Sequence, residues 1–335
     1  MEKISILVPC YNEENNINPM AKTLTDIMKR YYGKYDYEIL FRDNASTDNS
    51  LNIMRDIAMN DKHIKIIANA RNYGVDSIKD TYYGRISGEI CISIPCDFQE
   101  PPELIPEFIS WYEKGYEVVA GQKCSSKEGK IKYFLRQLYY RIIQVFSDIP
   151  QIPNMSGIFL CTKRILNLYY NNNRYETFRY FLTDLGCEIK LIQYEQNKRR
   201  SGKSSYNIWR SLSFSISSLI DVSTTPLRIA TIFGILCAAM SFFAGLTYLI
   251  MKLIWWDRFS AGMVPVMIAV FFLGSIQISF IGLIGEYVGT ILKRVTPNNP
   301  PLVKELINFD NPDDDPYLIK SVQDNIIETE IETDR

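Results

Sequence analysis

The sequence contains a single histidine, His63, among its 335 residues. A multi-histidine metal centre is therefore excluded. His63 follows a predicted helix in the stretch KHIKIIA, and we expect it at the surface or at the start of a strand rather than in a catalytic site. Chemistry in this protein must then rest on carboxylates, amides, basic side chains or a bound cation.

The seven cysteines also lack a pattern that would give them a structural or metal-binding role. Their number is odd, their spacing forms no disulfide framework, and no CxxC pair occurs. Cys91 and Cys96 lie in or near one apolar strand, which favours core packing over zinc binding. The opening residues, MEKISILVPC, read as a strand without an apolar signal segment, so we expect the domain that follows to reside in a reducing cytosol.

Two nucleotide-binding patterns are missing as well. No G-x-G-x-x-G occurs, and Gly202-Lys203-Ser204 is not a phosphate-binding loop because Asn197 stands where that motif needs glycine. The 37 basic and 38 acidic residues nearly cancel, which argues against a nucleic-acid partner. Acidic residues dominate from Asp310 to Arg335, and we expect a solvated, partly disordered tail there.

Charged residues are absent from Ile229–Met251 and from Phe259–Gly285. Each segment exceeds the ~20 apolar residues that cross a bilayer as a helix. Only the short turn KLIWWDR separates them, so the sequence predicts a hairpin of transmembrane helices at 228–254 and 259–292. A buried helix pair in a large soluble protein is the alternative.

The basic residues predict the orientation of this hairpin. They cluster before it and directly after it, at Lys198, Arg199, Arg200, Lys203, Arg210, Arg228, Lys293 and Arg294. Both ends are therefore expected in the cytosol. This divides the chain into a catalytic domain at 1–200, a basic loop with a juxtamembrane amphipathic helix at 201–227, the two spans, and a cytosolic acidic tail at 293–335. The amphipathic stripe within 207–221 suits either a membrane surface or the soluble domain.

Before the hairpin, strand and helix patterns alternate. Apolar, β-rich runs occur at Ile4–Val8, Tyr37–Phe41, Ile64–Ala68, Ile90–Ile94, Val118–Gly121 and Cys187–Tyr194. Helical patterns occur at Asn16–Arg30 and Asp48–Met59, with Asn, Ser, Thr or Asp as candidate N-caps. Such alternation predicts an α/β fold with a mostly parallel sheet.

Polar clusters follow four of these strands. They read PCYNEE after the first, DNASTD after the second, RNYG after the third and CDFQEPPE after the fourth. Because ligands of open α/β sheets bind beyond the carboxyl ends of the strands, four clusters at one edge predict a site.

These segments resemble the family-two glycosyltransferases with a GT-A fold, above all the polyprenyl-phosphate sugar transferases such as dolichyl-phosphate mannose synthase and the bactoprenol glucosyltransferases. VPCYNEENNI is similar to the nucleotide-binding opening, DNASTDNS to the Asp-Asp-Gly-Ser segment, and CDFQEPPELI to the metal segment. KRRSGKSS is similar to the basic loop before the membrane, and GEYVGTILKR to the end of the second span.

The resemblance implies a role for each matching residue. The nucleotide sugar is expected at Pro9, Tyr11, Asn12, Glu13, Asp43, Asn72 and Asp97, and Mg²⁺ or Mn²⁺ at Asp97 and Gln99. Arg199, Arg200, Ser201 and Lys203 are expected to bind the acceptor phosphate or the diphosphate, with Asp97 and Arg199 as the catalytic pair. A basic collar on anionic lipid headgroups is the alternative for these cations.

Three positions depart from the family pattern. Pro95 replaces the first aspartate of the metal segment, Gly157 stands where the family often has aspartate, and Ser205 replaces a usual lysine. These departures affect the expected metal geometry and donor sugar more than the reaction class.

The implied reaction is inverting transfer of a sugar from a UDP- or GDP-linked donor to a polyprenyl phosphate such as undecaprenyl phosphate. A phosphate monoester is already anionic near neutral pH, which suits a site without histidine. The implied location is a membrane, in bacteria the inner one, and a second copy could cover lipid-facing helix surface. Two alternatives stay open at this point: an inactive nucleotide-sugar-binding or regulatory protein on the same scaffold, and a processive synthase, which usually has more spans and a Gln-x-x-Arg-Trp motif.

Overall fold

The protein is described from a computed structural model, which covers residues 1–74, 82, 84–125, 141, 144, 147, 150, 152–172, 175, 177–197, 223–254, 263–295 and 301–319. The chain forms two compact units. One unit is built around an eight-stranded sheet and the other contains two long helices.

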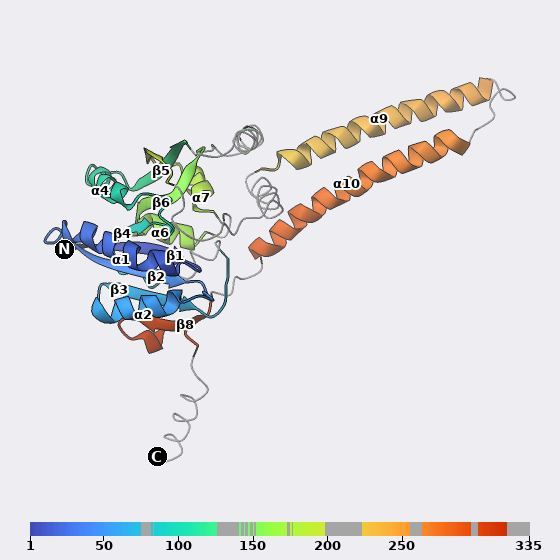
Figure 1. The fold of residues 1–335 in the computed structure, drawn as a ribbon. Helices are drawn as coiled ribbons and strands as arrows, with labels where there is room; N and C mark the ends of the chain where they lie inside the picture. The colour runs from blue at the N-terminus through green and yellow to red at the C-terminus, as the bar shows by residue number, and fades with distance from the viewer. Residues whose placement is uncertain are drawn as a thin grey trace, which may run out of the picture. The chain divides into compact units, whose positions relative to one another are not determined.

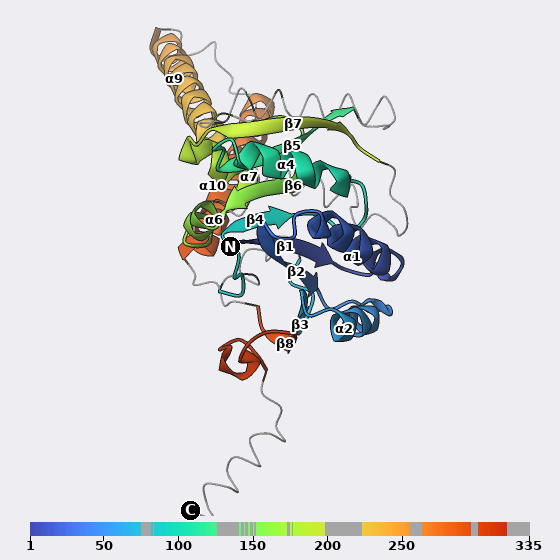
Figure 2. The ribbon, with the colours of Figure 1, turned by 90° about the vertical axis from the view of Figure 1, so that its left-hand side faces the viewer.

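The sheet has the strand order β7-β5-β6-β4-β1-β2-β3-β8 (Figures 1 and 2). Its strands are β1 (Glu2–Cys10), β2 (Tyr35–Asp43), β3 (Ile64–Asn69), β4 (Ile90–Ser93), β5 (Val118–Ser125), β6 (Met155–Thr162), β7 (Ile189–Glu195) and β8 (Val303–Ile307). β1 pairs in parallel with both β2 and β4, whereas β6 and β8 run antiparallel to their neighbours. The sheet is therefore mixed, with a parallel centre.

The register brings the polar clusters together. β1 and β2 pair without interruption from Glu2↔Tyr35 to Cys10↔Asp43, and β2 pairs with β3 up to Asp43↔Ala68. The three strands thus end level with one another. The segments that follow them leave the sheet at the same edge, as the carboxyl ends of parallel strands should.

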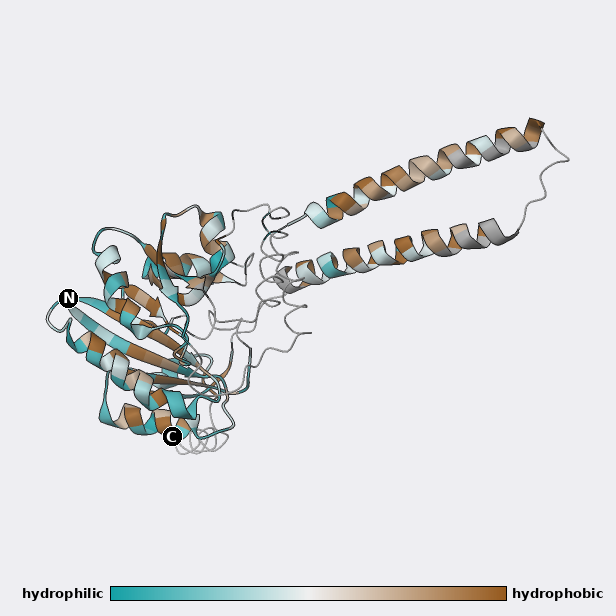
Figure 3. Ribbon diagram, turned by 45° about the horizontal axis from the view of Figure 1, so that its top comes forward, coloured by the Kyte–Doolittle hydropathy of each residue, from teal (hydrophilic) through white to brown (hydrophobic). Residues whose placement is uncertain are grey.

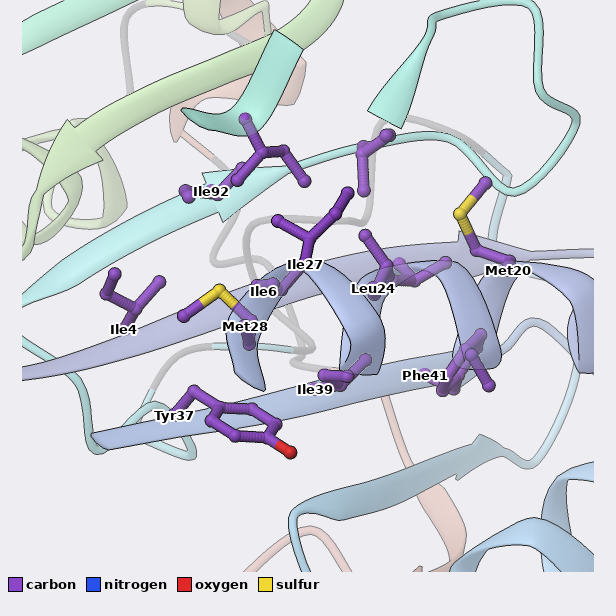
Figure 4. Close-up of a cluster of buried hydrophobic side chains, with 14 of the residues drawn as sticks. Ile4, Ile6, Met20, Leu24, Ile27, Met28, Tyr37, Ile39, Phe41 and Ile92 are labelled. Atoms are coloured by element: carbon purple, nitrogen blue, oxygen red, sulfur yellow. The ribbon is translucent and has the colours of Figure 1, made fainter. Parts of the chain in front are cut away.

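Helix α1 (Glu14–Lys29) covers the middle of one sheet face (Figure 4). Its buried residues include Met20, Leu24, Ile27 and Met28, at helical spacing. They pack on alternate residues of the central strands: Ile4, Ile6, Tyr37, Ile39, Phe41 and Ile92. Alternate strand residues share a face, so the apolar pattern of these strands itself selects the face that α1 covers.

Further helices in the described part of the chain pack on the sheet or follow it. They are α2 (Ser50–Asn60), the short η1 (Pro102–Leu104), α4 (Ile105–Tyr112), α6 (Lys163–Tyr170), α7 (Phe178–Leu185) and, near the end of the chain, η2 (Pro312–Asp314). Residues of α2 and α4 join the same core as α1. α6 contacts β4 and β6, where Cys91 and Cys161 belong to the opposite face of the sheet and are fully buried.

The predicted strands and the two predicted helices are all present, with small shifts of their ends. Two strands were not predicted. β6 lies between β4 and β5 in an order that follows no simple strand–helix alternation, and β8 belongs to a segment whose composition indicates only a tail. Part of the expected acidic tail, residues 303–319, therefore packs on the sheet unit.

Three smaller expectations can be compared with the structure. The helices begin with Glu13 as the N-cap of α1, which is not one of the expected residue types, and Asn49 as the N-cap of α2. Neither side chain makes a capping bond; the Asp48 carboxylate accepts the Ser50 N–H instead, at 3.0 Å. His63 is exposed just before β3, as expected. Cys91 and Cys96 are buried free thiols in the core, also as expected.

The second unit contains α9 (Thr225–Ile254) and α10 (Met263–Val295), which run antiparallel (Figures 1 and 3). Each is long and apolar enough to cross a bilayer, over Thr225–Thr247 and Phe272–Leu292, and these stretches are not buried inside the protein. Phe233 and Phe280 meet edge to face with their ring centroids 6.2 Å apart. The helices thus match the two predicted spans and contradict the alternative of a buried pair. The expected amphipathic helix within 207–221 and the Trp255–Trp256 turn lie outside the described residues.

Candidate active site at the sheet edge

The segments after β1 and β2 are locked together by reciprocal hydrogen bonds. The Asn12 N–H donates to Ser46 Oγ at 2.9 Å, and the Thr47 N–H donates back to Asn12 Oδ1 at 2.8 Å. A second link runs from the Glu13 N–H to Ser50 Oγ, at 2.9 Å. Asn12 has a φ of +55°, a left-handed conformation that asparagine tolerates better than most residues. Such strain persists where surrounding contacts fix it, commonly at functional sites.

Asp43 ends β2 and is only 2% exposed. Both of its carboxylate oxygens lie 3.2 Å from the Ser46 N–H, which they accept. Burial raises the pKa of Asp43, while the bonds from Ser46 oppose that rise. Asp43 therefore shapes the loop that carries Ala45, whose φ is +60°.

Asn44 connects this loop to the one after β3. Its Nδ2 donates to Asn72 Oδ1 at 3.0 Å and to the Gly74 carbonyl at 3.2 Å. Its Oδ1 accepts from Asn69 Nδ2 at 3.0 Å and from the Tyr73 N–H at 3.2 Å. One buried amide thus fixes the RNYG loop, and Asn72 itself stays exposed.

The CDFQEPPE segment follows β4 on the other side of β1. The Cys10 thiol donates to the Val8 carbonyl at 3.6 Å, and burial, followed by an interaction with the Cys96 thiol, raises the pKa of Cys10. Asp97 is partly exposed, and its Oδ1 accepts the Gln99 N–H at 3.2 Å across Phe98, whose φ is +57°. The thiol pair therefore joins the Asp97 segment to the loop after β1.

Glu100 is a buried carboxylate three residues after Asp97. It is 4% exposed, and its Oε1 lies 3.3 Å from Lys123 Nζ and 3.3 Å from the Tyr194 hydroxyl. Burial raises the pKa of Glu100; the Lys123 charge opposes this rise and the Asp97 charge adds to it. The negative charges of Asp97 and Glu100 therefore repel each other, and a cation bound at Asp97 would reduce this repulsion.

Two of the three departures from the family pattern, Pro95 and Gly157, lie next to each other, just beyond β4 and within β6. Ser93 of β4 pairs with Phe159 of β6, and the chains continue to Pro95 and Gly157. A Cβ atom added to Gly157 would lie 3.1 Å from Pro95 Cγ. The proline ring therefore occupies part of the space that a side chain at 157 would need, so the two carboxylates that the family often has here are replaced together.

The donor set fits a divalent cation only in part. Among the described residues, no three His, Cys, Asp or Glu side chains converge to hold an ion by themselves. Mg²⁺ in transferase sites usually takes one or two carboxylates, with waters and substrate phosphates as the other ligands. Asp97, partly exposed at the sheet edge, suits that arrangement; Gln99 also lies there, half-buried.

Several predicted site residues lie at this edge of the sheet. Asn12, Glu13 and Asp43 share one hydrogen-bonded network with Asn72, and Pro9 and Tyr11 lie on the same segment as Asn12. Glu13 is buried and accepts from Asn16 Nδ2 at 2.6 Å, so it also has a local structural contact. Arg199, Arg200, Ser201 and Lys203 lie outside the described residues, but the Asn197 N–H, two residues before Arg199, donates to the Gln99 carbonyl at 3.1 Å.

Sequence reasoning did not single out Asn44, Glu100 or Lys123 individually. The first two lie inside the DNASTD and CDFQEPPE segments, so their position after a strand was the available signal. Nothing in the sequence around Lys123 indicates a site residue. Its contact with Glu100 depends on how β5 and β7 pair in the folded sheet.

Comparison with known proteins adds the family. Residues 5–177, slightly more than half of the chain, match the model of glycosyl transferase family 2, and residues 225–291 match a model described as the GtrB C-terminal hairpin. A prophage-derived bactoprenol glucosyl transferase of Shigella flexneri is 28% identical over 313 residues, covering 92% of this chain and 100% of the relative. The putative glycosyltransferase CsbB of Bacillus subtilis is 27% identical over 314 residues, covering 92% and 93%.

Among solved structures, glucosyl-3-phosphoglycerate synthase from Mycobacterium tuberculosis superposes with a TM-score of 0.47 at 16% identity, covering 66% of this chain and 77% of that one. The family match, the mixed sheet with its parallel centre and the two apolar helices confirm the predicted GT-A fold with a following helical hairpin. The chain therefore belongs to glycosyltransferase family 2 and is a membrane-anchored glycosyltransferase.

Proposed function

We propose that this enzyme transfers a hexose, with glucose the first candidate, from a nucleoside diphosphate sugar to a polyprenyl phosphate. The observation that carries the proposal is the joint presence of the polar network at one sheet edge and the hairpin match at 225–291. The bactoprenol glucosyl transferases that resemble this chain do so over nearly their whole length. UDP and GDP are both compatible with the described residues.

The chain's own residues divide the work. We propose that the loops around Asn12, Asp43 and Asn72 bind the nucleotide, because they are interlocked and leave Asn72 exposed. Arg199 and its neighbours would meet the phosphates, since the Asn197–Gln99 bond brings the start of the basic loop to the Asp97 segment. Arginine and lysine make strong charge-assisted bonds to phosphate oxygens.

The reaction needs positioning and charge stabilisation more than a strong base. An oxygen of the lipid phosphate attacks the anomeric carbon, the bond from that carbon to the donor diphosphate breaks, and the configuration inverts. The nucleophile is already anionic at neutral pH, so no residue has to remove a proton. A divalent cation held at Asp97 would supply positive charge to the leaving diphosphate.

We also propose that the catalytic unit faces the cytosol, because basic residues flank both ends of the hairpin. In bacteria the membrane would be the inner one. A second copy of the chain could cover the exposed hairpin surface, although the proposal does not depend on it.

A panel experiment tests the proposal. Membranes containing the full chain are incubated with radiolabelled UDP- and GDP-linked hexoses, with and without undecaprenyl phosphate. We expect label in a lipid-extractable product only when the lipid phosphate is present, and for one nucleotide. Label released only as free sugar would point to hydrolysis, and label in a growing polymer would favour a synthase; either result would contradict the proposal.

A further inference from the structure

The chain beyond the second membrane helix returns to the sheet and contacts the loop after β3. We propose that this C-terminal strap, residues 302–319, is a working part of the donor site, which positions the RNYG loop (Arg71–Gly74) through Tyr73. Donor binding would then depend on a segment that follows the membrane hairpin in the sequence. This inference rests on the proposed function, in which the RNYG loop borders the bound nucleotide.

The strap is part of the sheet, as its backbone bonds show. β8 pairs antiparallel with β3 from Ile66↔Ile307 to Asn69↔Val303, with an irregularity between Ala68 and Asn69. Val303 is fully buried. In Figure 2, β8 lies beside β3, at the opposite end of the sheet from β7. An edge strand of this kind covers backbone groups of β3 that would otherwise face solvent.

Two bonds connect the strap to the RNYG loop and to the residue just before it. The Ala70 N–H donates to the Leu302 carbonyl at 2.9 Å, and the Leu302 N–H donates to the Tyr73 hydroxyl at 3.1 Å. The Arg71 guanidinium lies 4.5 Å from the centroid of the Tyr73 ring. Since Asn44 holds the same loop from the β2 side, the loop is fixed from both sides, and the strap provides the outer one.

The strap has its own anchors away from the loop. Arg55 of α2 makes a forked ion pair with Glu305, with its Nε at 3.1 and 3.2 Å and its Nη2 at 2.5 Å from the carboxylate. Arg85 makes a second forked pair with Asp315, at 2.7 and 2.8 Å, and both of these side chains are largely buried. Forked pairs of this geometry fix orientation as well as distance.

Asn308 adds a third anchor. Its Nδ2 lies 2.7 Å from the Ala58 carbonyl and 2.8 Å from the Ile64 carbonyl, at the two ends of the turn between α2 and β3. Asn308 adopts a left-handed backbone conformation (φ +61°). Such a conformation persists where surrounding contacts fix it, which is not expected in a solvated tail. Three independent anchors hold the strap in place, and its direct bond to Tyr73 lets it support the RNYG loop from the outer side.

The first test uses the purified full chain and Tyr73→Phe, which removes the hydroxyl and keeps the ring. Loss of one such hydrogen bond should raise the KM for the nucleotide sugar that the wild type uses, UDP- or GDP-linked, roughly 2- to 10-fold. The KM for the lipid phosphate and kcat should change much less, because the loop borders only the nucleotide. An unchanged donor KM in Tyr73→Phe would overturn the proposal.

The second test uses charge reversal at the Arg55–Glu305 pair. Arg55→Glu and Glu305→Arg should each raise the donor KM and weaken binding of UDP or GDP, whichever the wild type binds, and the double variant should recover. Failure of the double variant to recover would also overturn the proposal, because general damage would then explain the single variants. The matched control is the exposed pair of Lys34 and Glu113, 2.7 Å apart and remote from the strap; its reversal should leave nucleotide binding unchanged.

These readouts separate the two claims. If the wild-type chain transfers no sugar, the proposed function fails, whereas binding of UDP or GDP, whichever the wild type binds, still reports on the strap. If the wild-type chain transfers sugar and every strap variant binds that nucleotide as tightly as the wild type, the strap inference fails alone.

Discussion

Asp97 is the residue on which metal dependence should rest. Asp97→Asn keeps the shape of the side chain and removes its charge, so binding of Mn²⁺ in the presence of UDP should weaken. Loss of even an outer partner of a metal site usually costs about 10- to 100-fold, and we expect transfer to fall by at least that much.

Electron paramagnetic resonance of Mn²⁺, with and without UDP, would measure this directly, alongside transfer assays in EDTA. The exposed Glu103, in the same segment, offers the matched control Glu103→Gln, which should bind Mn²⁺ like the wild type. Full transfer in EDTA, or an unimpaired Asp97→Asn variant, would contradict a role for a divalent cation at Asp97.

Pro95 and Gly157 should behave as a coupled pair. Gly157→Asp places a Cβ atom about 3.1 Å from Pro95 Cγ, and overpacking of this kind costs about 1–3 kcal/mol. Pro95→Ala removes the ring, so the double variant should be more stable than the sum of the two single effects. Chemical unfolding of the detergent-solubilised chain measures the cycle; additive free energies would show that the contact has no energetic consequence.

The sequence predicts which residues gather at the site better than it predicts how they are held. Asn12, Asn72 and Asp97 follow strands and Asp43 ends one, and that local pattern is sufficient to place them at one edge. The role of Asn44 as the link between two loops depends on groups 25 to 30 positions away. No local pattern encodes a pairing of that kind.

At the level of secondary structure, one buried carboxylate links strands β1, β2 and β3 away from the site edge of the sheet. Glu38 of β2 is 1% exposed; its Oε1 accepts from Ser5 Oγ at 2.5 Å and from the Ser87 N–H at 2.8 Å, and Lys65 Nζ lies 2.9 Å from its Oε2. Burial alone would raise the pKa of Glu38, but the bonds from Ser5, Lys65 and Ser87 outweigh it and lower the pKa to about 2.

A lowered pKa means that the folded state favours the ionised carboxylate. The resulting stability is complete above the ordinary pKa of 4.5 and is lost as pH falls towards 2. We expect the free energy of unfolding to drop by up to about 3 kcal/mol over that range. Glu38→Gln should be less stable at pH 7 and should lose less stability on acidification, whereas the exposed Glu107→Gln should follow the wild type. Parallel pH profiles for Glu38→Gln and wild type would contradict this.

Six strands and two helices could be predicted because their apolar residues repeat with the period of the element. β6 and β8 could not. β6 is antiparallel between two strands that precede it, so its place depends on tertiary pairing, and β8 is a five-residue edge strand whose stability comes from Arg55 and β3. Short edge strands carry too few residues for a periodic signal.

For the whole molecule, the basic residues around the hairpin predict a cytosolic catalytic unit. Ser260→Cys, between the end of α9 and the start of α10, should react with an impermeant thiol reagent in intact cells. Met59→Cys, at a site that is 74% exposed on the catalytic unit, should react only after permeabilisation. The exposed native Cys124 is first replaced by serine. Labelling of Met59→Cys from outside would reverse the orientation.

The chemical identity of the product distinguishes a polyprenyl-phosphate hexosyltransferase from a hydrolase or a polymerising synthase. The purified full chain, UDP- or GDP-linked hexose and undecaprenyl phosphate are combined, and the lipid fraction is analysed by mass spectrometry while nucleoside diphosphate release is followed in parallel. We expect one hexose on each product lipid, joined through the phosphate with inverted anomeric configuration, and one nucleoside diphosphate released per lipid formed. Nucleoside diphosphate release without any hexosyl lipid, for every donor offered, would contradict it.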